Sequence, residues 1–160
     1  MKRSTVIAFV LVVLTAAAVV MAQAEKDNPQ LGTWKMNIAK STFTSGTGFK
    51  SATSKIEVVD GGVRHTLDTV YGDGTSRNYA YTTAYDGMDK PVIGNSPYGD
   101  TTALTRVDAQ TVRTVYKKNG KVTVIQTSVV SSNGKTRTVT TKGTNPMGQA
   151  VDNVSVYDKQ

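Results

Sequence analysis

The sequence predicts an all-β protein, an antiparallel up-and-down meander that closes into a β-barrel. Three observations support this prediction. Gly, Asn and Asp occur together at short intervals, in pairs that suit tight hairpin turns. The segments between these turns are short and rich in Val, Thr and Tyr, which favour pleated strands. After the first 24 residues no segment shows the apolar spacing of an amphipathic helix.

The N-terminal residues predict a signal peptide. Lys2 and Arg3 precede an apolar run over residues 6–22, and the tripeptide Ala22-Gln23-Ala24 provides small residues for cleavage. We therefore expect residues 1–24 to be removed and the protein to be periplasmic or secreted, without stable membrane insertion afterwards. The alternative is an uncleaved anchor, for which this run is slightly short, since a spanning helix needs about 20 residues.

The remaining residues, 25–160, are predicted to form a single barrel domain of about eight to ten strands. Turn signals lie at residues 60–62, 72–74, 86–87, 119–120 and 133–134. The expected strands are 31–38, 53–59, 63–71, 75–85, 88–94, 101–107, 111–118, 121–131, 135–143 and 150–158. A long meander removes its exposed edges most easily by closing on itself. Residues 39–52 are expected to form a loop or at most one helical turn.

Charge and cysteine content exclude several classes of protein. The formal charge of +7 falls to +5 when Lys2 and Arg3 leave, and the lysines are scattered, so there is no basic stripe for a nucleic acid. The chain has no cysteine, so disulfides cannot stabilise it. His65 is its only histidine, and we expect no metal site and no cofactor.

Two-residue turns fix the register of the strands between residues 111 and 143. Around residues 119–120, Arg113 falls opposite Gln126, and around residues 133–134, Val130 falls opposite Arg137. One face then carries Arg113, Val115, Val122, Val124, Gln126, Ser128, Val130, Arg137 and Val139. The other carries Val112, Thr114, Tyr116, Thr123, Ile125, Thr127, Val129, Thr138 and Thr140.

Neither of these faces is clearly apolar, so the sequence leaves open which one lines the interior. If the first face points inward, Arg113 and Gln126 form a polar pair in the cavity. Arg137 would then need a partner of its own, because an unpaired buried charge is costly.

The hairpin predicted around residues 86–87 gathers aromatic side chains. Tyr85 falls opposite Met88, Tyr81 opposite Val92 and Tyr79 opposite Gly94, on one face that extends to Arg77. Pro91 lacks an N–H toward the next strand, so that pairing should be weak or absent. The barrel would then have a gap or lip here, or the sheet would be open with a protected edge.

The start of the first predicted strand resembles a known signature. Gly32-Thr33-Trp34-Lys35 is similar to the Gly-x-Trp motif of the calycins, the group of lipocalins and fatty-acid-binding proteins. In that family the tryptophan closes one end of the barrel and commonly packs under an arginine from a late strand. This resemblance implies a lipocalin-like barrel in which Gly32 and Trp34 are structural.

The last strand adds to the resemblance. Residues 156–159 look like the terminal strand of fatty-acid-binding proteins, in which an Arg-x-Tyr pair binds the ligand carboxylate. Tyr157 matches the tyrosine and is assigned a structural role, whereas Ser155 occupies the arginine position, so the carboxylate site is not carried over. The mature chain as a whole resembles small exported bacterial proteins described as lipocalin-like.

These observations predict a monomeric barrel that holds a small apolar or amphipathic molecule non-covalently in its interior. The candidate ligand-binding residues are Tyr79, Tyr81, Met88 and Val92 as liners, with Arg113 and Gln126 as polar anchors. The alternative is a ligand-free structural or protein-interaction module of the cell envelope. We do not expect an enzyme: no nucleophile elbow or ordered triad accompanies His65, which shares a face with Val63 and Leu67.

Overall fold

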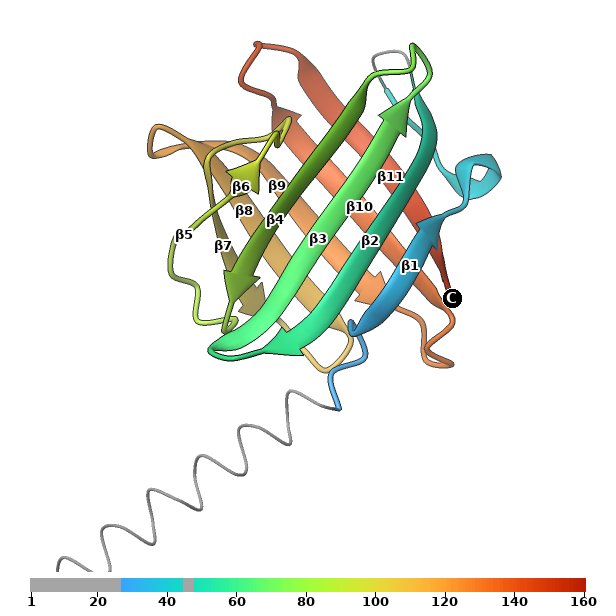
Figure 1. The fold of residues 1–160 in the computed structure, drawn as a ribbon, viewed down its shortest axis with the longest axis vertical. Coiled ribbons are helices and arrows are strands. Elements are labelled where there is room, and N and C mark those ends of the chain that lie inside the picture. The colour runs from blue at the N-terminus through green and yellow to red at the C-terminus, as the bar shows by residue number, and fades with distance from the viewer. Residues whose placement is uncertain (1–26, 45–47) are drawn as a thin grey trace, which may run out of the picture.

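The computed structural model describes residues 27–44 and 48–160, which form one antiparallel sheet curled into a nearly closed barrel (Figure 1). The strands are β1 Gly32–Met36, β2 Phe49–Val59, β3 Gly62–Tyr71, β4 Ser76–Thr83, β5 Lys90–Pro91, β6 Ile93–Gly94, β7 Thr101–Arg106, β8 Thr111–Lys118, β9 Lys121–Val130, β10 Thr136–Thr144 and β11 Ala150–Lys159. A single 3-10 turn, η1, spans Ile38–Lys40. The predicted all-β meander and barrel are confirmed.

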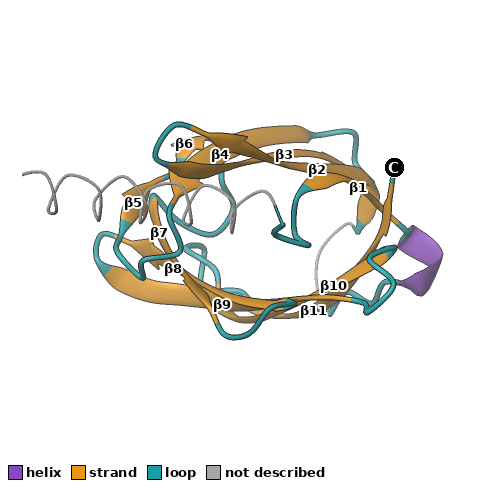
Figure 2. Ribbon diagram, turned by 90° about the horizontal axis from the view of Figure 1, so that it is seen from below, coloured by secondary structure: helices purple, strands orange, loops and turns teal. Residues whose placement is uncertain are grey.

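Neighbouring strands in the barrel are consecutive in the chain, except where β1 meets β11 and where β5 pairs with β7 while β6 pairs with β4. β1 pairs with β2 on one side and with β11 on the other, so the two ends of the described domain lie side by side. Figure 2 shows the sheet as a flattened ring, with β1 to β4 and β6 in one layer and β7 to β11 in the other. In the described part of the chain no helix is long and apolar enough to span a membrane. The expected signal peptide lies outside the described residues.

Most predicted strands agree with the structure to within one or two residues, because the turns between them are local. Asn119 and Gly120 both have positive φ, 51° and 76°, which is the geometry that a tight primed turn requires. The segment at 39–52 differs in part: η1 is the single helical turn, Thr42 bridges to Val154 of β11, and β2 already begins at Phe49.

The predicted strand 88–94 is divided in the structure. Its last part, β6, pairs with β4 and places Tyr79 opposite Gly94 as predicted. Its first part, β5, leaves β4 and pairs Pro91 with Thr101 of β7. This short segment therefore joins the two ends of the sheet. The pairing around Pro91 is weak, as expected: β5 and β7 share two residue pairs, and β4 and β6 share two.

The predicted pairing of Arg113 with Gln126 is wrong. Between β8 and β9 the register shifts by one residue, so that Thr123 and Val124 of β9 lie opposite Tyr116 alone. Beyond this bulge Arg113 faces Thr127, and Thr114 faces Gln126. A Cβ on Gly143 of β10 would lie 2.2 Å from the Thr123 carbonyl oxygen, so only glycine allows the bulge to pack there.

The bulge decides which side chains enter the barrel. The inward residues are Val112, Thr114 and Tyr116 of β8, Val124, Gln126, Ser128 and Val130 of β9, and Arg137, Val139 and Thr141 of β10. On β8 the inward face is therefore the predicted face that carries Tyr116. On β9 and β10 it is the other predicted face, which carries Gln126 and Arg137. The predicted pairing of Val130 with Arg137 is confirmed.

Candidate functional site

One end of the barrel is closed by Trp34. Its indole is fully buried and donates a hydrogen bond from Nε1 to the Gln30 carbonyl oxygen, 2.8 Å away. The Arg137 guanidinium of β10 lies over the indole with Cζ 5.4 Å from the ring centroid, and the Lys159 ammonium lies 5.0 Å from it. Gly32 precedes Trp34 with φ 123°, a conformation that L side chains rarely adopt.

The segment before β1 completes this closure with hydrogen bonds. The Gln30 side chain, 2% exposed, donates to the Gln110 carbonyl oxygen at 2.8 Å and accepts from the Ser128 hydroxyl at 2.9 Å. Asn28 is also buried and donates to the Tyr85 hydroxyl at 3.0 Å. Buried amides that are paired in this way tie the N-terminal segment to β9 and to the 107–110 turn.

Above the indole lies a row of aromatic side chains from β3, β4 and β8. The His65 and Tyr81 rings stack with centroids 4.8 Å apart, and Tyr116 meets Tyr81 edge to face at 6.2 Å. The Tyr116 hydroxyl is 3.5 Å from that of Tyr81, which in turn is 3.4 Å from His65 Nδ1. Burial raises the pKa of Tyr81 to about 12, so this phenol remains protonated at neutral pH.

His65 and Arg137 are the two buried basic groups of this region. Burial, and to a smaller degree the charge of Arg137, lower the pKa of His65 to about 3, so the imidazole is neutral. Burial lowers the pKa of Arg137 too, and nearby tyrosines, Tyr157 first, oppose that shift. Nε2 of His65 and Nε of Arg137 have no hydrogen-bond partner within the described part of the chain.

The interior leaves only small spaces between these side chains. A cavity of about 40 Å³ is lined by His65, Arg137, Tyr81, Gln126 and neighbouring residues. A second, of about 30 Å³, lies toward the other end, between Leu67, Tyr79, Tyr98 and Tyr157. Pockets that hold drug-sized molecules measure about 300–1,000 Å³, so neither space takes a molecule of that size.

The end of the barrel opposite Trp34 carries a larger pocket of about 330 Å³, which we call the mouth pocket. It lies among the turns at the upper end in Figure 1, where β3 turns into β4 and β10 into β11. The residues that line it are Gly48, Phe49, Tyr71, Asp73, Thr75, Arg77, Pro97, Tyr98, Asn145, Met147, Gln149, Val151 and Asn153.

Aromatic rings form one wall of the mouth pocket. Phe49 stacks on Tyr71 with centroids 5.1 Å apart, and Phe43 packs against Phe49 at 4.7 Å. The Arg77 guanidinium lies over Tyr71 at 5.8 Å and donates to the Asn95 side-chain oxygen at 2.9 Å. Asp73 accepts from the backbone N–H and the hydroxyl of Thr75, which lowers its pKa and keeps it charged.

Tyr98 separates the mouth pocket from the interior. Its ring packs against Tyr116 at 5.4 Å, and its carbonyl oxygen accepts from the Thr123 hydroxyl at the bulge. Both the mouth pocket and the smaller inner cavity below are lined by Pro97 and Tyr98. Two residues after Tyr98, Asp100 pairs with Lys118 of β8, 3.3 Å apart.

The structure brings together only part of the predicted ligand site. Tyr79 and Tyr81 are buried in the interior, where Gln126 also lies and donates to the Thr141 hydroxyl at 3.1 Å. Val92 is half-buried against the same aromatic cluster. The structural residues Trp34 and Tyr157 share one core cluster, where Arg137 lies over Tyr157 at 4.9 Å, and Gly32 lies against Lys159.

Two predicted site residues are placed wrongly by sequence reasoning. Arg113 is exposed on the outer face of β8, because the bulge moves it one register away from Gln126. Met88 is 62% exposed, because the chain at residues 84–89 does not form the tight hairpin that would turn it inward. Tyr85 instead has φ 58°, and Asp86 bridges to Thr105 of β7.

The mouth residues were missed because they come from segments far apart in the chain. Phe49, Tyr71, Tyr98 and Met147 lie on or beside four different turns, and sequence spacing gives no sign that these turns meet. In the sequence prediction Arg77 only marks the end of the strand face that carries Tyr79 and Tyr81. The one available signal was the presence of aromatic side chains beside turns, where exposure would otherwise favour polar residues.

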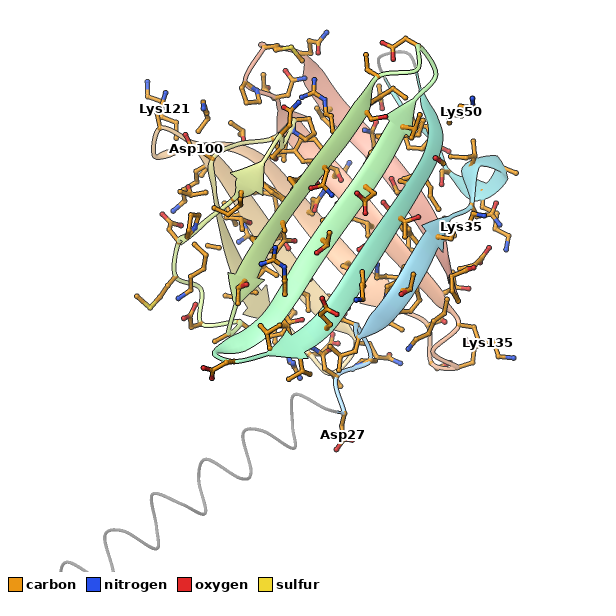
Figure 3. All side chains as sticks on the ribbon, in the orientation of Figure 1. Asp27, Lys35, Lys50, Asp100, Lys121 and Lys135 are labelled. Carbon is orange, nitrogen blue, oxygen red and sulfur yellow. The ribbon has the colours of Figure 1, made fainter. Side chains whose placement is uncertain are left out.

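The surface charges are dispersed, as the scattered lysines of the sequence indicate. Figure 3 shows Lys35, Lys50, Lys121 and Lys135 at well-separated places on the outside of the barrel. Several lysines pair with nearby acids, for example Lys117 with Asp89 at 2.8 Å. No protein-family model matches the chain, and no curated protein is significantly similar to it.

Proposed function

We propose that the protein is an exported, calycin-like barrel that binds a small amphipathic molecule non-covalently. The observation that supports this most directly is the mouth pocket. Its volume of about 330 Å³ falls within the range of about 300–1,000 Å³ that is typical of ligand sites, and barrel mouths are common places for them. It also favours a ligand-binding protein over a ligand-free envelope module.

The closed end supports the resemblance to calycins. The Gly-x-Trp residues Gly32 and Trp34 lie in the first strand, and an arginine of a late strand, Arg137, packs over the indole. This is the arrangement that the resemblance implies. Ser155 stands in the position of the carboxylate-binding arginine, so we do not place a ligand carboxylate there.

The lining of the mouth pocket defines the chemistry of the ligand. The Phe49 and Tyr71 rings and the Met147 side chain offer apolar surface for a flat or branched hydrocarbon part. Arg77 offers charged N–H donors, the Asp73 carboxylate offers a charged acceptor on the same lining, and Asn145, Gln149 and Asn153 offer amides that can donate and accept. A molecule with an apolar body and one acidic or strongly accepting group fits this lining.

The first test is native mass spectrometry of the protein after export from a bacterial host, beside the mass of the denatured chain. We expect an excess mass that is lost on denaturation and that identifies the ligand class. The denatured mass also tests cleavage after Ala24. A bare polypeptide mass, together with no binding of the probe described next, would favour the envelope module.

A direct test uses 1-anilinonaphthalene-8-sulfonate, an aromatic sulfonate, as a fluorescent probe. We expect Arg77→Gln to weaken its binding by about 1.5–3 kcal/mol, the value of a hydrogen bond to a charged group. Arg64→Gln is the matched control: Arg64 is exposed on the neighbouring strand β3 and lines none of the described pockets. Equal affinities of the two variants would exclude Arg77 from the site.

A further inference from the structure

Arg137 carries its charge into the barrel interior, where only 5% of its surface is exposed. Trp34 and Tyr157 lie against the guanidinium, at 5.4 Å and 4.9 Å from ring centroid to Cζ. Among the described residues, none of the ion pairs includes Arg137, and its Nε is buried without a hydrogen bond. Aromatic rings offset part of the cost of burying a cation, but they do not accept a hydrogen bond from the buried Nε–H.

His65 presents a second unbonded nitrogen in the same place. Its Nδ1 lies 3.4 Å from the Tyr81 hydroxyl, which in turn lies at the end of a chain of hydroxyls that begins with Tyr116. When Tyr81 donates to Nδ1, the proton of the neutral imidazole is on Nε2. This buried Nε2–H has no partner among the described residues and is a free donor.

Both nitrogens belong to residues that line the cavity of about 40 Å³. The other polar liners are Gln30, Ser54, Thr114, Gln126 and Ser128 with the Tyr81 and Tyr157 phenols, and no Asp or Glu is among them. One water needs about 10–15 Å³ in such a space, so the cavity accommodates a particle of a few heavy atoms at most. The lining is rich in donors, carries one positive charge and has the size of a small ion.

From this arrangement we infer that the interior cavity is a binding site for a small monovalent anion, of the size of a halide or formate. The anion accepts hydrogen bonds from Arg137 Nε and His65 Nε2 and compensates the buried guanidinium charge. Water would satisfy the hydrogen bonds alone, whereas an anion also balances the charge. This site is separate from the mouth pocket and does not depend on its ligand.

The buried indole provides the test, because Trp34 is the only tryptophan and lies directly on Arg137. The exported, processed protein is exchanged into sodium sulfate and titrated with sodium bromide at constant ionic strength. We expect saturable quenching of Trp34 fluorescence and a rise of several degrees in the melting temperature. Sulfate, a larger dianion, does not fit the cavity but stabilises folded proteins in general, so the change in melting temperature is compared between wild type and the variants below in the same salts. Formate should reproduce the rise in melting temperature.

Two variants assign the effect to the cavity. Arg137→Met should abolish the saturable response, whereas Arg113→Met, which removes an exposed arginine from β8, should keep it. If Arg137→Met does not fold, His65→Phe retains a ring to stack on Tyr81 and removes the Nε2–H donor, together with the Nδ1 contact to the Tyr81 hydroxyl outside the anion site. We expect it to weaken bromide binding by about tenfold.

Crystals grown in bromide should also show anomalous scattering beside Arg137. Melting responses to bromide that are identical in wild type and Arg137→Met, together with no anomalous signal in the cavity, would overturn the inference and indicate that only water is bound. The proposed mouth site is tested separately, because Arg77→Gln should leave the bromide response unchanged.

Discussion

The end of the barrel around Trp34 and the end around Tyr71 both contain aromatic side chains, but in different settings. At the closed end the indole is fully buried, and Gln30, Asn28 and Arg137 surround it with buried polar contacts. At the mouth Tyr71 is half-exposed and lines a pocket of about 330 Å³. The comparison indicates that the closed end holds the fold together and that the mouth is free to bind.

The largest expected effect is the loss of the buried indole. Trp34→Ala should lower the free energy of unfolding by about 3–5 kcal/mol, because the removed ring leaves a cavity in a packed region. Met147→Ala, at a mouth residue that is 67% exposed, should change it by less than about 0.5 kcal/mol. Urea unfolding followed by far-ultraviolet circular dichroism measures both. Similar losses of unfolding free energy in the two variants would contradict the view that the closed end stabilises the fold more than the mouth does.

The next effect comes from the amide that ties the closed end together. Gln30→Ala should cost about 1–3 kcal/mol, because the Gln110 carbonyl and the Ser128 hydroxyl lose buried partners. The matched change at the mouth is Gln149→Ala, which removes only an exposed hydrogen bond to Asn145 and should lie within about 0.5 kcal/mol of wild type. If Gln149→Ala were the more damaging change, the mouth would be structural too.

A third effect, of about 2 kcal/mol between pH 6.5 and 5, is a dependence of stability on pH that arises at the closed half of the interior. The pKa of His65 is about 3 in the folded protein and about 6.5 when unfolded, so below pH 6.5 only the unfolded chain binds this proton. The free energy of unfolding should therefore fall by about 1.4 kcal/mol for each pH unit between 6.5 and 3. Above pH 6.5 the contribution is complete and constant.

His65→Phe should remove this slope between pH 6.5 and 5, where no other side chain of the chain has its ordinary pKa. Urea unfolding of both proteins at pH 7 and pH 5 measures the difference. A slope that persists in the variant would show that another group carries the pH dependence.

The strands and turns could be predicted because they depend on neighbours in sequence. Asn119-Gly120 readily adopts the positive φ of a tight primed turn, and the Val- and Thr-rich runs beside it favour strands. The predicted gap near Pro91 likewise follows from one missing N–H. In each case the preference is intrinsic to a short peptide segment.

The inward face of β8 could not be predicted by counting from the turn. The bulge opposite Tyr116 is accommodated by Gly143 on the next strand, and its effect is to place Arg113 in solvent while Arg137 stays inside. A register shift of one residue exchanges the two faces of a strand. For the same reason the predicted anchor Arg113 was wrong while Gln126 was placed inside.

The sequence by itself thus determined the fold class, most of the strand boundaries and the Gly-x-Trp start of the barrel, since these follow from local backbone preferences and side-chain alternation. Only the tertiary structure decided that Arg137 and His65 share a small cavity and that Phe49, Tyr71, Tyr98 and Met147 meet at the mouth. Those residues lie on strands and turns that are distant in sequence, and closure of the sheet brings them together.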